Sequence, residues 1–299
     1  MLAILIPIYN FDVRTLVQTL QQQCSDAKID FEIRCLDDGS TEYFKKGNRT
    51  LAHLDRVWYE ELTQNVGRSA IRNLLAASTL QPYLLFMDCD SKVNHADYIQ
   101  RYLERLDPQT LLYGGRTYAP HPPSDQAYYF HWHYGKKREQ KPAEQRQKKA
   151  YHAFMTNNFL IPKSIFSQVG FEESLHQYGH EDTLFGLLLQ EKGVPIVHLD
   201  NPLEHIGLES QAVFLKKSRL AIENLWQLAQ THPKIDTRLL QLYRQLHRWS
   251  LARIARMVYR LLFPIIKWQL KKSNTSLFTF DLYKLGLLLA MDQQKDGRN

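Results

Sequence analysis

Two aspartates, Asp88 and Asp90, flank a single residue directly after the apolar run at residues 83–87. On an extended backbone, residues i and i+2 point to the same side, so we expect these two carboxylates to lie together. Paired carboxylates suit a hard divalent cation such as Mg²⁺ or Mn²⁺, which completes its coordination with phosphate oxygens and water. The sequence shows no obvious basic neighbour for the pair, and it therefore predicts a divalent metal site at this strand end.

Further acidic and basic side chains could bind a nucleotide. Asp37 and Asp38 precede a Gly-Ser pair, which indicates either a simple turn or a carboxylate that accepts hydrogen bonds from a nucleobase or ribose. Arg68 and Arg72 lie one helical turn apart, so that their guanidinium groups could meet phosphate or a base edge. Each arginine taken alone is equally compatible with a solvated surface.

A third group of residues could carry the proton transfer. Asp182 is the candidate general base. If a hydroxyl attacks a second molecule by direct displacement and accepts the transferred group, a carboxylate within hydrogen-bond reach must take the proton of that hydroxyl. The neighbouring Glu181 would orient the acceptor, although acidic residues in a first helical turn also favour the helix dipole. His205 could complete a metal shell through a neutral imidazole, or it could be structural.

Alternating strands and helices must position these residues. Such alternation predicts βαβ units and a mostly parallel sheet, in which ligands bind at the carboxyl ends of the strands. The polar clusters fall at those ends, after the first, second and fourth predicted strands. We expect strands at 2–8, 31–36, 56–60, 83–87, 111–117, 157–161 and 194–199, and helices at 13–23, 66–78, 95–106 and 179–190.

The bulk composition fits a soluble α/β protein with an appendage. The chain has 299 residues, and we expect a catalytic domain at 1–210 and a helical extension at 211–299. Its three cysteines show no metal-binding spacing and no targeting segment is visible, so we expect a cytoplasmic location, either free or peripheral on the cytoplasmic membrane face. Residues 119–150 indicate a long, partly mobile excursion over the sheet rim. Its charged run at 136–149 is expected to face solvent. We expect this excursion and residues 172–180 to select the acceptor molecule.

Taken in order, the motifs resemble glycosyltransferase family 2 over roughly residues 1–210. The motifs are Pro7-Ile8-Tyr9-Asn10, Asp37-Asp38-Gly39-Ser40, Asn65-Val66-Gly67-Arg68 with Ala70-Ile71-Arg72-Asn73, Asp88-Cys89-Asp90 and Gly179-His180-Glu181-Asp182. The resemblance implies an α/β GT-A fold, a nucleoside-diphosphate sugar donor, with UDP as the expected nucleotide, and inversion at the anomeric carbon.

The same resemblance implies roles for single residues. Asp38 would contact the base, Asp88 the ribose and Asp90 the metal, and Asp182 would be the catalytic base. Some relatives that make polysaccharides carry a metal-binding histidine where His205 stands. The remaining motif residues, Pro7, Tyr9, Asn10, Asn65, Arg68 and Arg72, would line the donor site. Because Ile71 separates Ala70 from Arg72, where the family more often has Ala-Arg, it stays open which arginine meets the diphosphate.

The positive charge is concentrated near the carboxyl terminus. Residues 238–272 contain nine Lys or Arg and no Asp or Glu, and the rest of the chain has 38 − 9 = 29 basic against 31 acidic residues. Within residues 253–271 the basic side chains share one helical sector, with Trp268 and aliphatic residues largely opposite, and Pro264 should kink the helix. This pattern predicts an amphipathic helix on an anionic membrane surface, or one packed on the catalytic domain. No nucleic-acid recognition motif is present.

These observations predict a metal-dependent, inverting glycosyltransferase that acts on a hydroxyl of a saccharide or lipid-linked glycan. The alternative is an inactive nucleotide-sugar-binding module anchored to a membrane surface or a complex. The presence of Asp88, Asp90, Glu181 and Asp182 argues for the enzyme. A sugar nucleotidyltransferase is the third possibility, but the first strand is followed by Tyr9-Asn10-Phe11 and not by a glycine-rich phosphate loop.

Overall fold

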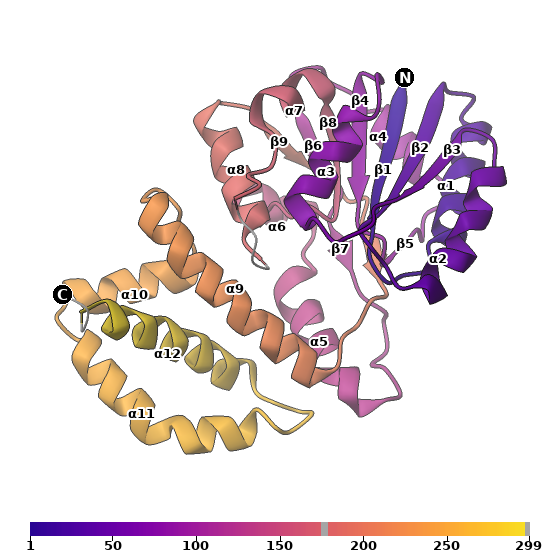
Figure 1. The fold of residues 1–299 in the computed structure, drawn as a ribbon. Helices are drawn as coiled ribbons and strands as arrows, with labels where there is room; N and C mark the ends of the chain where they lie inside the picture. Colours follow the sequence, from indigo (N-terminus) through magenta and orange to yellow (C-terminus); the bar gives the residue numbers. More distant parts are fainter. Residues whose placement is uncertain (175–178, 297–299) are drawn as a thin grey trace. The chain divides into compact units, whose positions relative to one another are not determined.

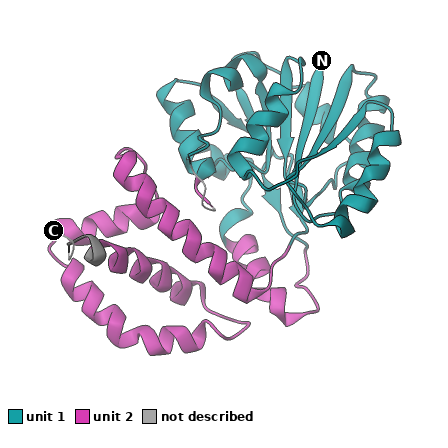
Figure 2. Cartoon of the chain, in the orientation of Figure 1, with its two compact units in different colours: residues 1–119, 138–176, 181–207 teal, residues 120–137, 177–180, 208–299 magenta. Residues whose placement is uncertain are grey.

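The computed structural model describes residues 1–174 and 179–296. Within them the chain forms two compact units, coloured separately in Figure 2. Of the described residues, 1–119, 138–174 and 181–207 make up the first unit, and 120–137, 179–180 and 208–296 make up the second. Residues 175–178, part of the segment predicted to select the acceptor, lie outside the described residues.

The first unit is built on a seven-stranded sheet with helices on both faces (Figure 1). Its strand order is β3-β2-β1-β4-β8-β6-β9, and only β8 runs antiparallel to its neighbours. The sheet is therefore mostly parallel, as predicted. The strands are β1 (Leu2–Ile8), β2 (Phe31–Asp37), β3 (Val57–Glu61), β4 (Tyr83–Met87), β6 (Leu111–Tyr113), β8 (Asn158–Pro162) and β9 (Ile196–His198).

Side chains of β1 alternate between the two faces of this sheet, as a strand requires. Ile4 and Ile6 pack in a core with α1, whereas Ala3 and Leu5 pack in a second core with α3 and α8. Burial on both faces explains why β1 reads as an uninterrupted apolar run. The helices of this unit are α1 (Arg14–Asp26), α2 (Glu42–Asn48), α3 (Arg68–Ala77), α4 (Tyr98–Leu103), α6 (Ala143–Gln147), α7 (Lys163–Val169) and α8 (Glu181–Glu191).

The strand predicted at residues 111–117 is divided at two glycines. β6 ends at Tyr113, and β7 (Arg116–Thr117) joins a separate three-stranded sheet with the order β5-β10-β7. Gly115 has a φ of +95°, a conformation that L side chains rarely adopt, and a Cβ there would lie 2.6 Å from the guanidinium of Arg146. A single uninterrupted strand was therefore a wrong prediction. The other two strands of the small sheet are β5 (Ser91–Lys92) and β10 (Leu203–His205).

The segment at residues 119–150 contains more helix than predicted. It includes a short 3₁₀ helix (Gln126–Tyr128), α5 (Tyr129–Tyr134), a π-helical turn (Gly135–Glu139) and α6. The prediction that its charged run is a solvated face is wrong for Arg146, which is buried and donates to the carbonyl oxygens of Gly114 (3.1 Å) and Leu199 (2.7 Å). The guanidinium thus satisfies backbone groups at the break after β6.

The second unit is helical. Aromatic and aliphatic side chains of α5, α9, α11 and α12 form its core, including Phe130, Phe280 and Ile266. α11 continues as one helix across Pro264. No helix among the described residues is both long enough and apolar enough to cross a membrane. The carboxyl-terminal helices are α9 (Gln211–Thr231), α10 (Arg238–Arg248), α11 (Ala252–Gln269) and α12 (Leu277–Asp296).

Candidate active site

Asp88 and Asp90 lie at the carboxyl end of β4. The backbone N–H of Asp88 donates to the carbonyl oxygen of Asn157 (3.1 Å), which fixes the strand end against β8. The chain then turns at residues 89–90 before β5 begins. The expected extended backbone is therefore wrong at residues 89–90, where the chain forms a turn.

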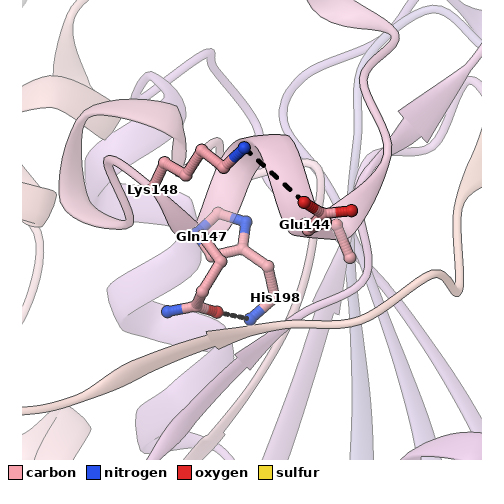
Figure 3. Close-up of a pocket in the computed structure, with 5 residues that line it drawn as sticks. Glu144, Gln147, Lys148 and His198 are labelled. Atoms are coloured by element: carbon pink, nitrogen blue, oxygen red, sulfur yellow. Dashed lines mark hydrogen bonds and ion pairs between the residues drawn. The ribbon is translucent and has the colours of Figure 1, made fainter.

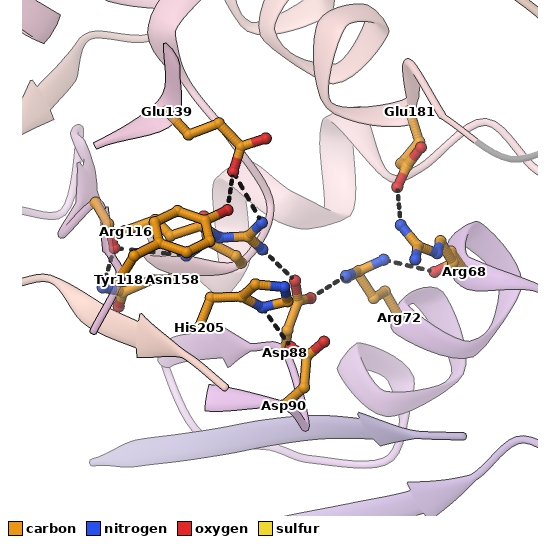
Figure 4. A network of polar contacts seen from close by, with 12 residues as sticks. Arg68, Arg72, Asp88, Asp90, Arg116, Tyr118, Glu139, Asn158, Glu181 and His205 are labelled. Atoms are coloured by element: carbon orange, nitrogen blue, oxygen red, sulfur yellow. Dashed lines mark hydrogen bonds and ion pairs between the residues drawn. The ribbon is translucent and has the colours of Figure 1, made fainter. Parts of the chain in front are cut away.

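Asp88 is held between two arginines, Arg72 from α3 and Arg116 from β7 (Figure 4). The oxygens of Asp88 lie 2.7 Å from Nη2 of Arg72 and 3.0 Å from Nη2 of Arg116. The expectation that this acidic pair has no basic neighbour is thus wrong. Two guanidinium groups balance the carboxylate charge, so Asp88 is not available as an uncompensated ligand for a cation.

Asp90 faces His205 instead. In the small sheet His205 is paired with Ser91, and the N–H of Ile206 donates to the carbonyl oxygen of Asp90 (2.9 Å). This pairing brings Nδ1 of His205 to 3.4 Å from Oδ1 of Asp90. Burial opposes ionisation of Asp90, but the neighbouring His205, Arg116 and Arg68 hold its pKa below the usual range.

The Asp90 and His205 side chains fit a divalent cation as a two-donor set. Oδ1 of Asp90 is buried and accepts no hydrogen bond from the described residues. A bound cation would supply the missing partner of this buried oxygen. Among the described residues no group of three His, Cys, Asp or Glu side chains gathers around a common point. The remaining positions would belong to phosphate oxygens and water, as is usual for Mg²⁺ bound with a substrate diphosphate.

Three residues that sequence reasoning missed, Arg116, Tyr118 and Glu139, complete this region. Arg116 also contacts Glu139 (3.3 Å), and the hydroxyl of Tyr118 donates to the same carboxylate. The Tyr118 ring packs edge-on against His205, with centroids 5.5 Å apart. Glu139 comes from the run that was predicted to be solvated, and only the folded chain brings it to the strand end.

The two arginines of α3 differ in their surroundings. Arg72 is buried and committed to Asp88, whereas the Arg68 side chain is half exposed and pairs with Glu181 from α8 (3.2 Å). The helical spacing predicted for them is correct, because α3 begins at Arg68. Of the two, Arg68 has the guanidinium that a ligand could reach.

Glu181 and Asp182 begin α8. Burial opposes ionisation of Glu181, but the charges of Arg68 and Arg72 lower its pKa. For Asp182, burial and then the adjacent negative charge of Glu181 raise the pKa to about 7. A carboxyl group with that pKa can take up and release a proton near neutral pH, as a general base must.

The loop before α3 is tied to the end of β2 through Asp38. Its carboxylate accepts the backbone N–H groups of Val66 (2.7 Å) and Gly67 (3.2 Å), and its carbonyl oxygen accepts from Nδ2 of Asn65 (3.1 Å). Burial nevertheless raises the pKa of Asp38. The structure thus brings Asp38 and Asn65 together, and Asp38 supports the loop that precedes Arg68.

The end of β1 joins the same edge. The N–H of Asn10 donates to Oγ of Ser40 (2.8 Å). Oδ1 of Asn10 accepts from the N–H of Thr41 (2.9 Å). Pro7 lies within β1, and Tyr9 is half exposed beyond it. Asp37 is fully buried and accepts from the N–H of Ser40 (2.7 Å), so the turn role is the one seen for this aspartate.

A surface pocket of about 420 Å³ lies elsewhere in the first unit, between α6 and β9 (Figure 3). Its lining consists of Ala143, Glu144, Gln147, Lys148 and His198. The Glu144–Lys148 ion pair and the hydrogen bond from the His198 backbone to Gln147 are internal to it. None of the predicted site residues lines this pocket.

Comparisons with known proteins agree with this architecture. A family model described as Glycosyl transferase family 2 matches residues 3–170, which is more than half of the chain. No curated protein gives a significant match.

Solved structures of glycosyltransferases share the fold. A mannosyltransferase from Pyrobaculum calidifontis, in complex with GDP-Man and Mn²⁺, is 14% identical with a TM-score of 0.58, over 99% of this chain and 87% of that one. Residues 1–349 of S. aureus TarS, in complex with UDP-GlcNAc, are 15% identical with a TM-score of 0.51, over 98% and 92%. The chain spans 42% of the longer TarS structure. The fold is of the GT-A type, with additional carboxyl-terminal helices, as predicted.

Proposed function

The chain belongs to glycosyl transferase family 2, and we propose that this glycosyltransferase uses Asp182 as the general base of an inverting, metal-dependent transfer. The donor is a nucleoside-diphosphate sugar, with UDP as the proposed nucleotide. The acceptor is a hydroxyl of a saccharide or a lipid-linked glycan. The observation that carries this proposal is the position of Asp182 in the first turn of α8, next to the Glu181 carboxylate that pairs with Arg68 at 3.2 Å. Burial and the charge of Glu181 raise the pKa of Asp182 to about 7.

In the proposed reaction, a carboxylate oxygen of Asp182 accepts the proton of the acceptor hydroxyl. The acceptor oxygen forms a bond to the anomeric carbon while the bond from that carbon to the diphosphate oxygen breaks. Attack from the face opposite the leaving group inverts the configuration. Glu181 stays ionised because Arg68 pairs with it, and its charge in turn keeps Asp182 basic enough for this step.

The leaving diphosphate carries negative charge that must be balanced. Arg68 is the half-exposed guanidinium at the start of α3, and we propose that it meets a phosphate oxygen. Asp90 and His205 would hold the divalent cation. Such a cation supplies further charge neutralisation to the diphosphate when it is bound.

Asp38, Asn65 and the end of β1 form the proposed nucleoside site. Support comes from their common position at the carboxyl edge of β1 and β2, where nucleotides bind to open α/β sheets. Tyr9 offers an exposed ring at this edge. The related structures contain UDP-GlcNAc in one case and GDP-Man with Mn²⁺ in the other, so both nucleotides belong in the test.

The test is a donor panel of UDP- and GDP-sugars with Mn²⁺, measured by donor hydrolysis and by the rise in melting temperature on binding. We expect a UDP-sugar to bind and to be hydrolysed slowly, and we expect Asp182→Asn to bind it equally well but to turn over at least 100-fold more slowly. Glu144→Gln, an exposed carboxylate outside the site, is the matched control. Equal turnover by Asp182→Asn would remove the base assignment, and binding without any turnover by the unaltered protein would favour an inactive module.

A further inference from the structure

The outer face of α11 carries large apolar side chains in contact with solvent. Leu261 is 72% exposed, and Met257 and Trp268 are 58% and 57% exposed. At about 100° per residue these positions fall on one side of the helix. The complete row is Ile254, Met257, Val258, Leu261, Ile265 and Trp268, and we call it the α11 apolar row.

The opposite side of α11 already packs within the second unit. Ile266 and Leu270 are buried in the core with Phe280. The ring of Tyr259 lies over Gly286 of α12, where even a Cβ would come within 2.0 Å of it. The α11 apolar row is therefore a second apolar face, which core formation in this unit does not require.

Basic side chains flank this row on one side. Arg253, Arg260 and Lys267 recur every seven residues and are exposed, so that they form a parallel line along the helix. Arg256 is different, because it turns inward and pairs with Asp292 (2.8 Å). Residues 238–272 contain nine Lys or Arg and no acidic residue, so this segment carries a concentrated positive charge.

We propose that the α11 apolar row binds an anionic membrane surface, with its helix parallel to the bilayer plane. The aliphatic side chains and the Trp268 ring would enter the boundary between headgroups and acyl chains, while Arg253, Arg260 and Lys267 contact the lipid phosphates. Nζ of Lys272 lies 3.4 Å from the centre of the Trp268 ring, so a cation and an amphipathic ring meet at the end of the row. Charge complementarity favours an anionic surface over a second copy of the chain, because two such faces would bring two basic flanks into the same interface.

The test is sedimentation of the full-length protein with vesicles, either of phosphatidylcholine alone or with about one third phosphatidylglycerol. The apolar variant is Leu261→Gln with Ile265→Gln, and its control is Leu80→Gln, a 96% exposed leucine of the first unit. The charge variant is Arg253→Gln, Arg260→Gln and Lys267→Gln. Its control is Arg105→Gln, Lys148→Gln and Lys149→Gln, three exposed basic residues of the first unit.

We expect binding to the anionic vesicles and at least tenfold weaker binding to the neutral ones. Each removed charge should lower the partition coefficient roughly fivefold, or on the order of 100-fold for the three, and both controls should bind like the unaltered protein. Both variants should keep the melting temperature and donor turnover, because neither alters a buried residue or the candidate active site. Trp268 fluorescence should shift to the blue on binding and lose that shift in Trp268→Phe.

Three results would overturn the proposal. The first is no sedimentation with either vesicle, and the second is equal binding by the apolar variant. The third is a doubled mass in sedimentation velocity that Leu261→Gln with Ile265→Gln abolishes, since that would assign the row to a second copy of the chain. Failure of this inference leaves the proposed transfer reaction standing, because the two tests use different residues and different readouts.

Discussion

Glu181 and Asp182 are adjacent in the first turn of α8, yet their pKa values shift in opposite directions. Both carboxyl groups experience burial, which disfavours their charged forms. Glu181 overcomes it because the Arg68 guanidinium lies 3.2 Å away, whereas Asp182 has a negative neighbour in Glu181. One residue is thereby kept ionised and the other is brought into the range where it exchanges a proton near pH 7.

This difference predicts a pH profile. The value of kcat/KM should rise with pH through a midpoint of about 7, because Asp182 must lose its proton before it can act as a base. Glu181→Gln removes the adjacent negative charge and should move this limb to lower pH. The measurement is initial rate against pH at subsaturating donor, with melting temperature as the control for folding. A limb that stays in place in Glu181→Gln would contradict the assignment.

The raised pKa of Asp182 also predicts that Asp182→Asn stabilises the folded protein. Well below pH 3.8, the ordinary pKa of an aspartate, Asp182 is protonated in both the folded and unfolded states. As pH rises toward about 7, the unfolded state ionises first, so the free energy of unfolding falls, by at most about 4 kcal/mol for a shift from 3.8 to about 7. Asp182→Asn cannot ionise and should be more stable than the unaltered protein at pH 8, and the gain should be much smaller at pH 4. Urea unfolding at both pH values measures the difference.

Arg72 and Arg68 predict contrasting costs for the same substitution. Arg72→Met removes a buried partner of Asp88 and should lower the free energy of unfolding by about 3 kcal/mol, at the low end for a broken buried pair because Arg116 remains. Arg68→Met removes a half-exposed ion pair and should cost less than about 1 kcal/mol. Arg68→Met should instead weaken donor binding. Equal losses of stability in the two variants would contradict the difference in burial between Arg72 and Arg68.

The alternation of strands and helices along the chain could be predicted from the sequence, and so could the sheet edge at which the polar residues lie, because both depend on local patterns. β1 and β4 have the predicted bounds, since a strand buried on both faces is a continuous apolar run. α4 is shorter than predicted because only Tyr98, Ile99 and Tyr102 of that pattern are buried in it. Helix ends depend on tertiary packing that the pattern does not contain.

The partners of Asp88 could not be read in this way. Arg116 reaches it only because the chain breaks at Gly115 and β7 pairs with β10, and both events depend on residues far apart in the sequence. Glu139 joins from a charged run whose composition favours solvent. The sequence therefore identified Asp90 and His205 as neighbours worth testing, but not the arginines that pair with Asp88.

The backbone at Gly207 lies directly against the Asp90 side chain, which gives a test of Asp90 as a metal ligand. A Cβ at this position would lie 2.4 Å from Oδ2 of Asp90, so Gly207→Ala must displace the carboxylate. We expect Mn²⁺ affinity, measured by the electron paramagnetic resonance signal of the free ion, to fall at least tenfold. Gly47→Ala is the matched control, because its Cβ would stand 3.5 Å from the Arg14 guanidinium, an ordinary contact. Unchanged Mn²⁺ affinity in Gly207→Ala would argue against Asp90 as a ligand.

His205 gives the corresponding test from the other side of the pair. Removal of divalent ions with EDTA should abolish turnover, and Mn²⁺ should restore it. His205→Gln keeps a polar side chain but replaces the imidazole that lies 3.4 Å from Asp90, and it should raise the Mn²⁺ concentration for half-maximal activity by 10- to 100-fold. His152→Gln, a histidine in a 3₁₀ turn outside the site, is the control. If His205→Gln keeps the Mn²⁺ requirement and loses only stability, the imidazole supports the turn at Asp90 and does not bind the ion.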